Sequence, residues 1–473
     1  MSDTIDVLIV GFGAVGVLYG WVLSQNPNVR VTALARSAYD DMKDGITIES
    51  EKFGKIENWK PYRLVQDVEE ANDRLYKYII CATKALPDVL PTASILAPFL
   101  ESQHNQSTVD LEDGATVVLM QNGVGTEHPL AVAYPHTPII SVVVWVGSNL
   151  KPGGRVVHGK LEELKIGLYT GEGSETGAAT EHAEDPLCDP HEYRKGPDGA
   201  ERLEEGKRRT KVFADLINNG GGAGTLVSGD IQVERYTKQL WNAAFSSVCA
   251  MSRSTVAEVV APAVLPYTLP YVRRMMLEVI YVARAWGYQE NVLPLKAVDD
   301  TIAITLRTYQ QRQAGVPPTP ATPGIVNSGY PFPTEGSPSQ DTVDSTVTFK
   351  PSLLLDVENN RPCELEVLIG SLLERARAKG VATPRLDGAY AMLKVHQDSA
   401  VRKYSSTPSY QQHISSWLSK PPSVGGLGAA GRKAWEKAVK GAQLSEYEKG
   451  SVGLAGGKDK IPGKPVHTES FVA

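Results

Sequence analysis

Cysteine and histidine are scarce in this chain of 473 residues, and neither is arranged as a metal site requires. The nine histidines form no HxxxH or HExxH pair, so a metal hydrolase would lack its ligands. The four cysteines are widely spaced without a CxxC pair: Cys81, Cys188, Cys249 and Cys363. This pattern argues against a disulfide framework and a zinc ribbon, and we expect a metal-free protein of a reducing compartment, the cytoplasm.

An excess of positive charge is also missing. Lysine and arginine total 48 against 54 acidic residues, a formal charge of −6, which argues against a general binder of nucleic acid or anionic membranes. The apolar run from Val7 to Leu23 has the length of a signal peptide, but Asp3 and Asp6 precede it without any Lys or Arg. Because a secretory leader begins with positive charge, we expect a soluble intracellular protein with no nucleic-acid or membrane partner.

Short apolar runs alternate with helix-like or loop segments over the first 170 residues. Such runs are typical of buried parallel strands, and the pattern predicts an α/β sheet covered on both faces. Residues 171–209 are rich in charge and glycine and poor in large aliphatic residues, so we expect a disordered insertion there. The expected strands are Ile5–Val10, Val29–Ala35, Tyr78–Ala82, Ala115–Met120 and Ile139–Trp145, with a weaker one at Gly224–Ser228.

The second half of the chain has helical periodicity and predicts an all-α domain over residues 229–404. Residues 314–349 contain seven prolines and no helical period, which indicates a loop insertion. Residues 405–473 are rich in Ser, Gly and Lys and are expected to form a poorly ordered tail. The expected helices are Val233–Ser252, Tyr267–Trp286, Pro294–Gln313, Ser352–Glu358, Cys363–Lys379 and Thr383–Gln397.

A glycine-rich GxGxxG motif follows the first expected strand and opens a helix. The first glycine allows a tight turn, the second lets backbone N–H groups approach a pyrophosphate, and the third lets helix and strand pack closely. In this context the motif predicts a Rossmann-type dinucleotide site over residues 1–228; the alternative is a tight strand–helix turn without a ligand. The residues expected to bind the cofactor are Gly11, Phe12, Gly13, Ala14, Val15 and Gly16.

Polar residues follow three other strands. Arg36 stands after the second strand, where an NAD site would place an acidic residue, so a 2′-phosphate and hence NADP is favoured. The alternative is a solvated surface arginine. Lys84 and Asn122 follow two further strands, where ligands of doubly wound sheets bind. For Asn122-Gly123 the alternative is a plain turn.

A polar stripe runs along one expected helix of the second domain. Lys238, Asn242 and Ser246 are spaced by four residues among apolar neighbours, so they share a face that must meet water or a polar ligand. A desolvated lysine has a lowered pKa and can donate a proton near neutral pH. The alternative is an ordinary solvent-facing stripe.

The segment from Ser352 through Asp356 to Glu364 forms another polar group. Ser352 could cap a short helix, and Glu364 falls in the first turn of the next helix, behind Pro362. A helix N-terminus favours a carboxylate without any catalytic role, so a purely structural Glu364 stays open.

Together these motifs resemble the ketopantoate reductase (2-dehydropantoate 2-reductase) family. The resemblance covers residues 5 to about 400 outside the two insertions and rests on GFGAVG, TKA, QNGVG, GGRVVHG, TKQLWN and PSLLLDVENNRPCE. It implies a Rossmann-type domain followed by helices like those of 6-phosphogluconate dehydrogenase, and NADPH-dependent reduction of a 2-oxo acid. It also implies the site residues: Lys238 as general acid, Glu364 as a catalytic carboxylate that contacts the cofactor, Lys84 on the cofactor side, Asn122 touching cofactor and substrate, and Asn242, Ser246 and Ser352 binding substrate.

The chain departs from the family where the substrate pocket is expected. Ser246, Val256 and Leu354 stand where pantoate-forming enzymes typically have amide side chains, which keeps a different 2-oxo or β-keto acid as an alternative. A third hypothesis is a non-catalytic NADP-sensing protein. Tyr330, Phe332 and Phe349 could cover the substrate as a lid, and a homodimer is compatible with the sequence.

Overall fold

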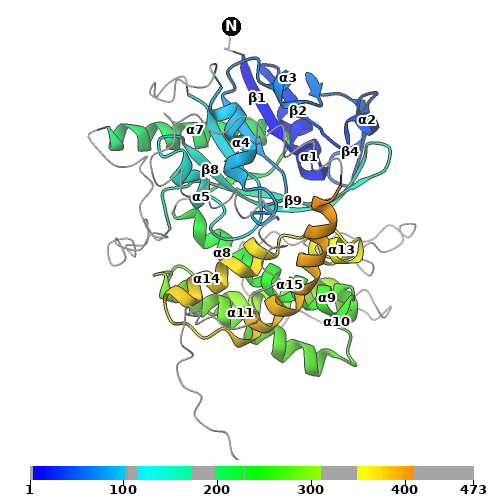
Figure 1. The fold of residues 1–473 in the computed structure, drawn as a ribbon, viewed down its shortest axis with the longest axis vertical. Helices are drawn as coiled ribbons and strands as arrows, with labels where there is room; N and C mark the ends of the chain where they lie inside the picture. Colours follow the sequence, from blue (N-terminus) through cyan, green and yellow to red (C-terminus); the bar gives the residue numbers. More distant parts are fainter. Residues whose placement is uncertain are drawn as a thin grey trace, which may run out of the picture.

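The computed structural model describes residues 4–102, 104, 114–172, 198–227, 229–310 and 349–407. In this part of the chain ten strands form one sheet, in the order β4-β3-β9-β8-β7-β6-β1-β2-β5, with β10 paired to β9. The sheet lies above a helical domain in the view of Figure 1. The strands are β1 Ile5–Val10, β2 Val29–Leu34, β3 Ile46–Ser50, β4 Gly54–Trp59, β5 Arg63–Val65, β6 Tyr78–Cys81, β7 Thr116–Leu119, β8 Ile139–Lys151, β9 Arg155–Leu168 and β10 Gly224–Leu226.

The middle of the sheet is parallel, and this determines where a ligand can meet it. β1 pairs in parallel with β2 and β6, β6 with β7, and β7 with β8. The carboxyl ends of these strands therefore lie along one edge. The segments that carry GFGAVG, Arg36, Lys84 and Asn122 all leave the sheet at that edge, where ligands of open α/β sheets bind.

Two hydrophobic layers cover the sheet, as the alternation of its strands requires. Val7 and Ile9 of β1 face one layer, which α1 and α7 complete. Leu8 and Val10 face the other, which α4 and α5 complete. The helices of this half are α1 Ala14–Ser24, α2 Tyr39–Met42, α3 Val68–Ala71, α4 Thr92–Leu100, α5 His128–Ala133 and α7 Gly199–Asn219.

The sheet is larger than the sequence predicts. The prediction omitted β3, β4, β5 and β9, and β8 continues past Trp145 to Lys151. β8 and β9 form a long antiparallel pair, so the sheet is mixed. β4 carries only two large apolar residues, Ile56 and Trp59, and no residue of the strand is fully buried. An edge strand of this kind has no continuous apolar run for a pattern search to detect.

The expected insertion at 171–209 is wrong at both ends. Gly199–Asn219 is one helix, α7, and Glu172 is buried at 1% exposure; residues 173–197 lie outside the described residues. Arg209 explains why a charged segment is ordered here. Its guanidinium is buried, donates to the carbonyl of Gly114 and to Thr116 Oγ1 at 3.0 Å, and pairs with Glu205.

A second hydrophobic core belongs to the helical domain, which lies below the sheet edge in Figure 1. The expected helix 233–252 is present, but its middle is a π-helical turn, η2. The helices are α8 Ile231–Trp241, η2 Asn242–Ser246, α9 Ser247–Ser252, α10 Val256–Val259, α11 Leu265–Ala285, α12 Lys296–Gln310, α13 Ser352–Glu358, the π turn η3 Glu366–Gly370, α14 Ser371–Ala378 and α15 Pro384–Ser405. The expected loop 314–349 and tail lie almost wholly outside the described residues.

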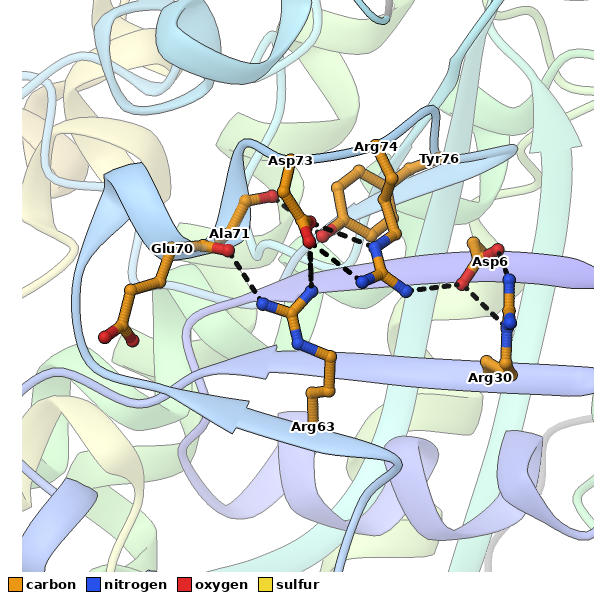
Figure 2. A network of polar contacts seen from close by, with 8 residues as sticks. All are labelled: Asp6, Arg30, Arg63, Glu70, Ala71, Asp73, Arg74 and Tyr76. Carbon is orange, nitrogen blue, oxygen red and sulfur yellow. Dashed lines mark hydrogen bonds and ion pairs between the residues drawn. The ribbon is translucent and has the colours of Figure 1, made fainter.

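Charged side chains tie the amino ends of the strands together (Figure 2). Arg30 of β2 forms an ion pair with Asp6 of β1, and Arg74 lies 3.5 Å from the same carboxylate. Asp73 accepts from Arg63 of β5 at 2.9 Å and from Arg74 at 2.8 Å. Single surface pairs stabilise little, and networks are more effective. This network joins the short edge strand β5 to β1 and β2 at the end opposite the ligand edge.

We predict that Arg209→Met lowers the free energy of unfolding by about 2 kcal/mol or more, because it leaves the Gly114 carbonyl and Thr116 hydroxyl buried without their donor. Chemical denaturation measures the change. Lys211→Met is the matched control, since Lys211 lies on the same helix but pairs with Asp215 in solvent. Equal stability losses in the two variants would show that Arg209 does not anchor α7.

Candidate active site

The three glycines of the GFGAVG motif occupy different environments. Gly11 has φ +94°, and a Cβ there would lie 2.5 Å from the backbone nitrogen of Thr83. A Cβ on Gly16 would collide with the carbonyl oxygen of Gly11. By contrast, a Cβ on Gly13 would meet no protein atom within 4 Å. The fold itself requires glycine at positions 11 and 16, whereas at position 13 glycine leaves open space at the start of α1.

The rest of the motif divides between core and surface. Phe12 is buried against Trp59, with ring centroids 6.2 Å apart, so it packs in the core. Ala14 is the first residue of α1, and Val15 lines the cavity described below. No side chain caps α1 at Gly13. Among the described residues no side chain therefore competes with a phosphate for the first N–H groups of α1.

Arg36 and Lys84 lie at the expected strand ends. Arg36 follows β2 and is exposed. Lys84 follows β6, and its ammonium forms an ion pair with the buried carboxylate of Asp356 on α13. Burial raises the pKa of Asp356 against the opposing effect of Lys84. Lys84 therefore joins the sheet edge to the helical domain.

Asn122 lies between a carboxylate and an ammonium. Its Nδ2 donates to Glu364 Oε2 at 3.0 Å, and its Oδ1 accepts from Lys238 Nζ at 2.7 Å. Glu364 Oε1 accepts from the backbone N–H of Ala85 at 3.0 Å. Glu364 lies in the loop just before η3 and not in the first turn of a helix as expected. Residues from two strand ends, that loop and α8 thus form one continuous chain of hydrogen bonds, and each Glu364 oxygen keeps a lone pair for a further donor.

Lys238 is electrostatically suited to release a proton. Its Nζ also donates to the carbonyl of Val144 at 2.6 Å and lies 5.6 Å from the centroid of the Trp145 ring. Burial lowers the pKa of Lys238, Glu364 opposes this shift and the charge of Arg235 adds to it, and the resulting pKa is about 8. At pH 7 the ammonium is still mostly protonated, and its pKa is close to the solution pH, as efficient acid catalysis requires.

A cavity of about 260 Å³ opens beside this lysine. Its described lining contains Lys238 and Lys350 but no Asp or Glu, which favours an anionic ligand. Lys350 is also paired with Glu358 at 2.8 Å. The expected substrate residues Asn122, Lys238, Asn242, Ser246 and Ser352 all line the cavity.

The π turn η2 helps to bring the polar stripe to this cavity. Each step of four residues overshoots a full α-helical turn by about 40°, so Ser246 would rotate away from Lys238 on a regular helix. The wider turn at Asn242–Ser246 reduces the overshoot at the second step. Such π turns occur frequently at functional sites, and the α-helical pattern alone could not predict this one.

Some expected roles in the pocket are wrong. Val256 and Leu354 are fully buried in the helical core, so of the three departures from the family only Ser246 lines the cavity. Ser352 does not cap α13, because Pro351 holds the N-cap position and no side chain caps the helix. Of the residues expected to form a lid, Phe349 lines the cavity, and Tyr330 and Phe332 lie outside the described residues.

The described residues contain neither a membrane-spanning helix nor a cluster of metal ligands. No helix among them is long and apolar enough to cross a membrane. Within the same residues, no group of three or more His, Cys, Asp and Glu side chains could hold a metal ion.

The fold and site define a class of protein: a dinucleotide-binding reductase with a helical second domain. Comparison with known proteins gives the family. A model described as "Ketopantoate reductase PanE/ApbA" matches residues 7–171, and its C-terminal counterpart matches residues 230–397. The chain belongs to the ketopantoate reductase family, and it is an oxidoreductase acting on CH–OH groups.

Individual relatives are distant. An uncharacterized protein of Saccharomyces cerevisiae is 24% identical, covering 83% of this chain and 93% of its own. The crystal structure of 2-dehydropantoate 2-reductase from Methylococcus capsulatus is 22% identical with a TM-score of 0.57, covering 85% and 98%. A ternary structure of D-mandelate dehydrogenase with NADH and anilino(oxo)acetate is 17% identical with a TM-score of 0.55, covering 84% and 99%. The two solved structures therefore share the fold of this chain.

Proposed function

We propose that the protein is an NADPH-dependent reductase of a 2-oxo acid, with 2-dehydropantoate reduced to pantoate as the leading reaction. Such a reaction would place it in pantothenate biosynthesis. The observation that carries the proposal is the hydrogen-bonded chain Glu364–Asn122–Lys238, which ends at a cavity whose lining is cationic. A non-catalytic NADP sensor would not need a lysine of lowered pKa that is hydrogen-bonded, through Asn122, to a carboxylate.

The residues at the sheet edge fit a dinucleotide. The space beside Gly13 and the uncapped start of α1 suit a pyrophosphate, and Arg36 suits a ribose 2′-phosphate. When bound, the reduced nicotinamide supplies a hydride to the carbonyl carbon. Asn122 lines the substrate cavity and is hydrogen-bonded to Glu364, and we assign Asn122 contacts with cofactor and substrate, and Glu364 contacts with the cofactor and the reacting region.

The chain's own residues complete the reduction. The carbonyl oxygen gains a proton as its carbon gains the hydride, and Lys238 donates that proton from its ammonium. Asn242, Ser246 and Ser352 bind the other oxygens of the substrate. A positioned acid contributes roughly 10²–10⁴-fold in rate, and the positive charge of Lys238 also stabilises the developing oxyanion.

One observation favours a different 2-oxo acid. The cavity has an aromatic wall, which we define as Trp241, Tyr309 and Phe349. The Phe349 ring centroid lies 6.5 Å from that of Trp241 and 5.9 Å from that of Tyr309. Such a wall suits an apolar or aromatic side group, like the ring in the anilino(oxo)acetate bound to D-mandelate dehydrogenase.

A substrate panel decides between these functions. We expect NADPH consumption with 2-oxo acids and the highest kcat/KM with 2-dehydropantoate. A higher kcat/KM for phenylglyoxylate would establish the alternative. NADPH binding without consumption of any 2-oxo or β-keto acid would instead support a sensor.

We predict that Lys238→Ala lowers kcat at least about 100-fold while NADPH still binds, since the proton donor is lost. In the wild type, kcat for reduction should fall as the pH rises through about 8, because the ammonium whose pKa lies there loses its proton. Steady-state rates from pH 6 to 10 and fluorescence titration with NADPH measure both effects. Near-normal turnover of the variant would remove Lys238 from the mechanism.

We predict that Arg36→Asp reverses the cofactor preference. A carboxylate repels the 2′-phosphate of NADPH and accepts from the free ribose hydroxyl of NADH. Because a charge-assisted contact changes affinity about 10–100-fold, the ratio of kcat/KM for NADPH to that for NADH should fall by that factor. An unchanged ratio would identify Arg36 as a surface residue only.

A further inference from the structure

Arg235 lies one helical turn before Lys238 on α8 and contacts the turn that carries Asn122. It is 3% exposed. One terminal nitrogen of its guanidinium donates to the carbonyls of Gln121 and Gly123, each at 2.9 Å. These are the two carbonyls on either side of Asn122, so a single side chain holds the backbone on both flanks of the central residue of the site.

A second layer of contacts holds the guanidinium in place. Arg235 forms an ion pair with Glu127, which is fully buried. Ser141 Oγ accepts from Arg235 Nε at 2.9 Å and donates to Glu127 Oε1 at 2.6 Å, and Gln232 Nε2 donates to the same oxygen at 3.0 Å. Although burial raises the pKa of Glu127, Arg235 and these donors keep it below its usual value, so the carboxylate stays charged.

The turn around Asn122 depends on support from outside. Gly123 and Gly125 have φ of +100° and +76°, and the turn belongs to no helix or strand. A Cβ on Gly123 would lie 2.5 Å from the carbonyl oxygen of Val367 in η3. The helical domain therefore encloses one side of the turn, and Arg235 satisfies its carbonyls on another.

We propose that Arg235, anchored by Glu127, is a positioning residue that holds Asn122 and Lys238 in register for proton transfer. It acts from the same helix as Lys238 and on the same turn as Asn122, so it fixes the distance between the two ends of that hydrogen bond. The assignment rests on the reductase function proposed above. Arg235 does not line the cavity beside Lys238.

The charge of Arg235 also affects the pKa of Lys238. The charged groups that act on Lys238 are Glu364, which favours its charged form, and Arg235, which disfavours it. Removal of Arg235 should therefore raise the pKa of Lys238, and removal of the Glu364 charge should lower it. A buried ion pair remote from Lys238 would leave this pKa unchanged.

The principal variant is Arg235→Met combined with Glu127→Gln, because the single change would leave Glu127 buried and unpaired. We expect kcat to fall by about 100-fold, the loss that a displacement of a catalytic group by about 1 Å can cause. The fall of kcat at alkaline pH, which we call the alkaline limb of the pH profile, should move to higher pH. Glu364→Gln should move the limb to lower pH.

Two further variants separate position, charge and stability. Arg235→Lys keeps the charge but has a single nitrogen, which cannot bind the two carbonyls and also replace the Nε contact with Ser141. We therefore expect kcat to fall while the alkaline limb of its pH profile stays in place. Arg209→Met removes an arginine of similar exposure that contacts the amino end of β7, opposite the end that leads to Asn122, and should leave the limb unmoved. If the double variant resembles Arg209→Met in kcat and pH profile, Arg235 is structural and the proposal is overturned.

A measurement without substrate keeps this proposal distinct from the proposed reaction. The rate at which a small acetylating reagent modifies Lys238, followed by mass spectrometry across pH, reports its pKa directly. We expect an apparent pKa near 8 in the wild type, a higher value in the double variant and a lower one in Glu364→Gln. These opposite shifts would uphold the electrostatic role of Arg235 even if no 2-oxo acid were reduced, and their absence would refute it.

Discussion

An amide can donate from one end and accept at the other, and the site depends on this property of Asn122. Its nitrogen must face the Glu364 carboxylate and its oxygen must face the Lys238 ammonium, because the reverse orientation would oppose like partners at both ends. The side chain therefore has one favourable orientation. Glu364 and Lys238 belong to the helical domain and Asn122 to the sheet edge, so both hydrogen bonds form only when the two domains are packed in one particular relative position.

Other polar contacts at the domain boundary are arranged in the same way. Lys84 from the sheet edge pairs with Asp356, and Arg375 from α14 pairs with the fully enclosed Glu172. Breaking a buried ion pair by removing one partner is far more costly than the net contribution of the pair to stability. These contacts therefore add little attraction between the domains and strongly penalise any other way of docking them. The interface obtains its specificity from charge and its adhesion from apolar packing.

The sequence predicts the parts of this molecule that local chemistry determines. β1 and α13 have the predicted bounds. The pattern that identifies each of them, an apolar β-branched run and a short Leu-rich helix, is complete within six or seven consecutive residues. The GxGxxG turn and the Lys238 stripe can be recognised for the same reason.

Edge strand β4 and the first half of α7 cannot be recognised from the sequence, since their order comes from partners distant in the chain. Arg209, for example, is only one of many charged residues in this segment of the sequence, and its contacts with Gly114 and Thr116 appear only in the fold. The pairing of Asn122 with both Glu364 and Lys238 also required the fold, because more than 100 residues separate Asn122 from either partner.

The unequal surroundings of the three motif glycines have an evolutionary consequence. A side chain at position 11 or 16 would meet the protein's own backbone, whereas one at position 13 would meet none of it. Selection for folding alone would therefore preserve the first and last glycines and let the middle one drift. A descendant of this chain that had abandoned its nucleotide could keep a motif that still looks nearly intact, so the middle glycine is the informative one when a relative is suspected of having lost its chemistry.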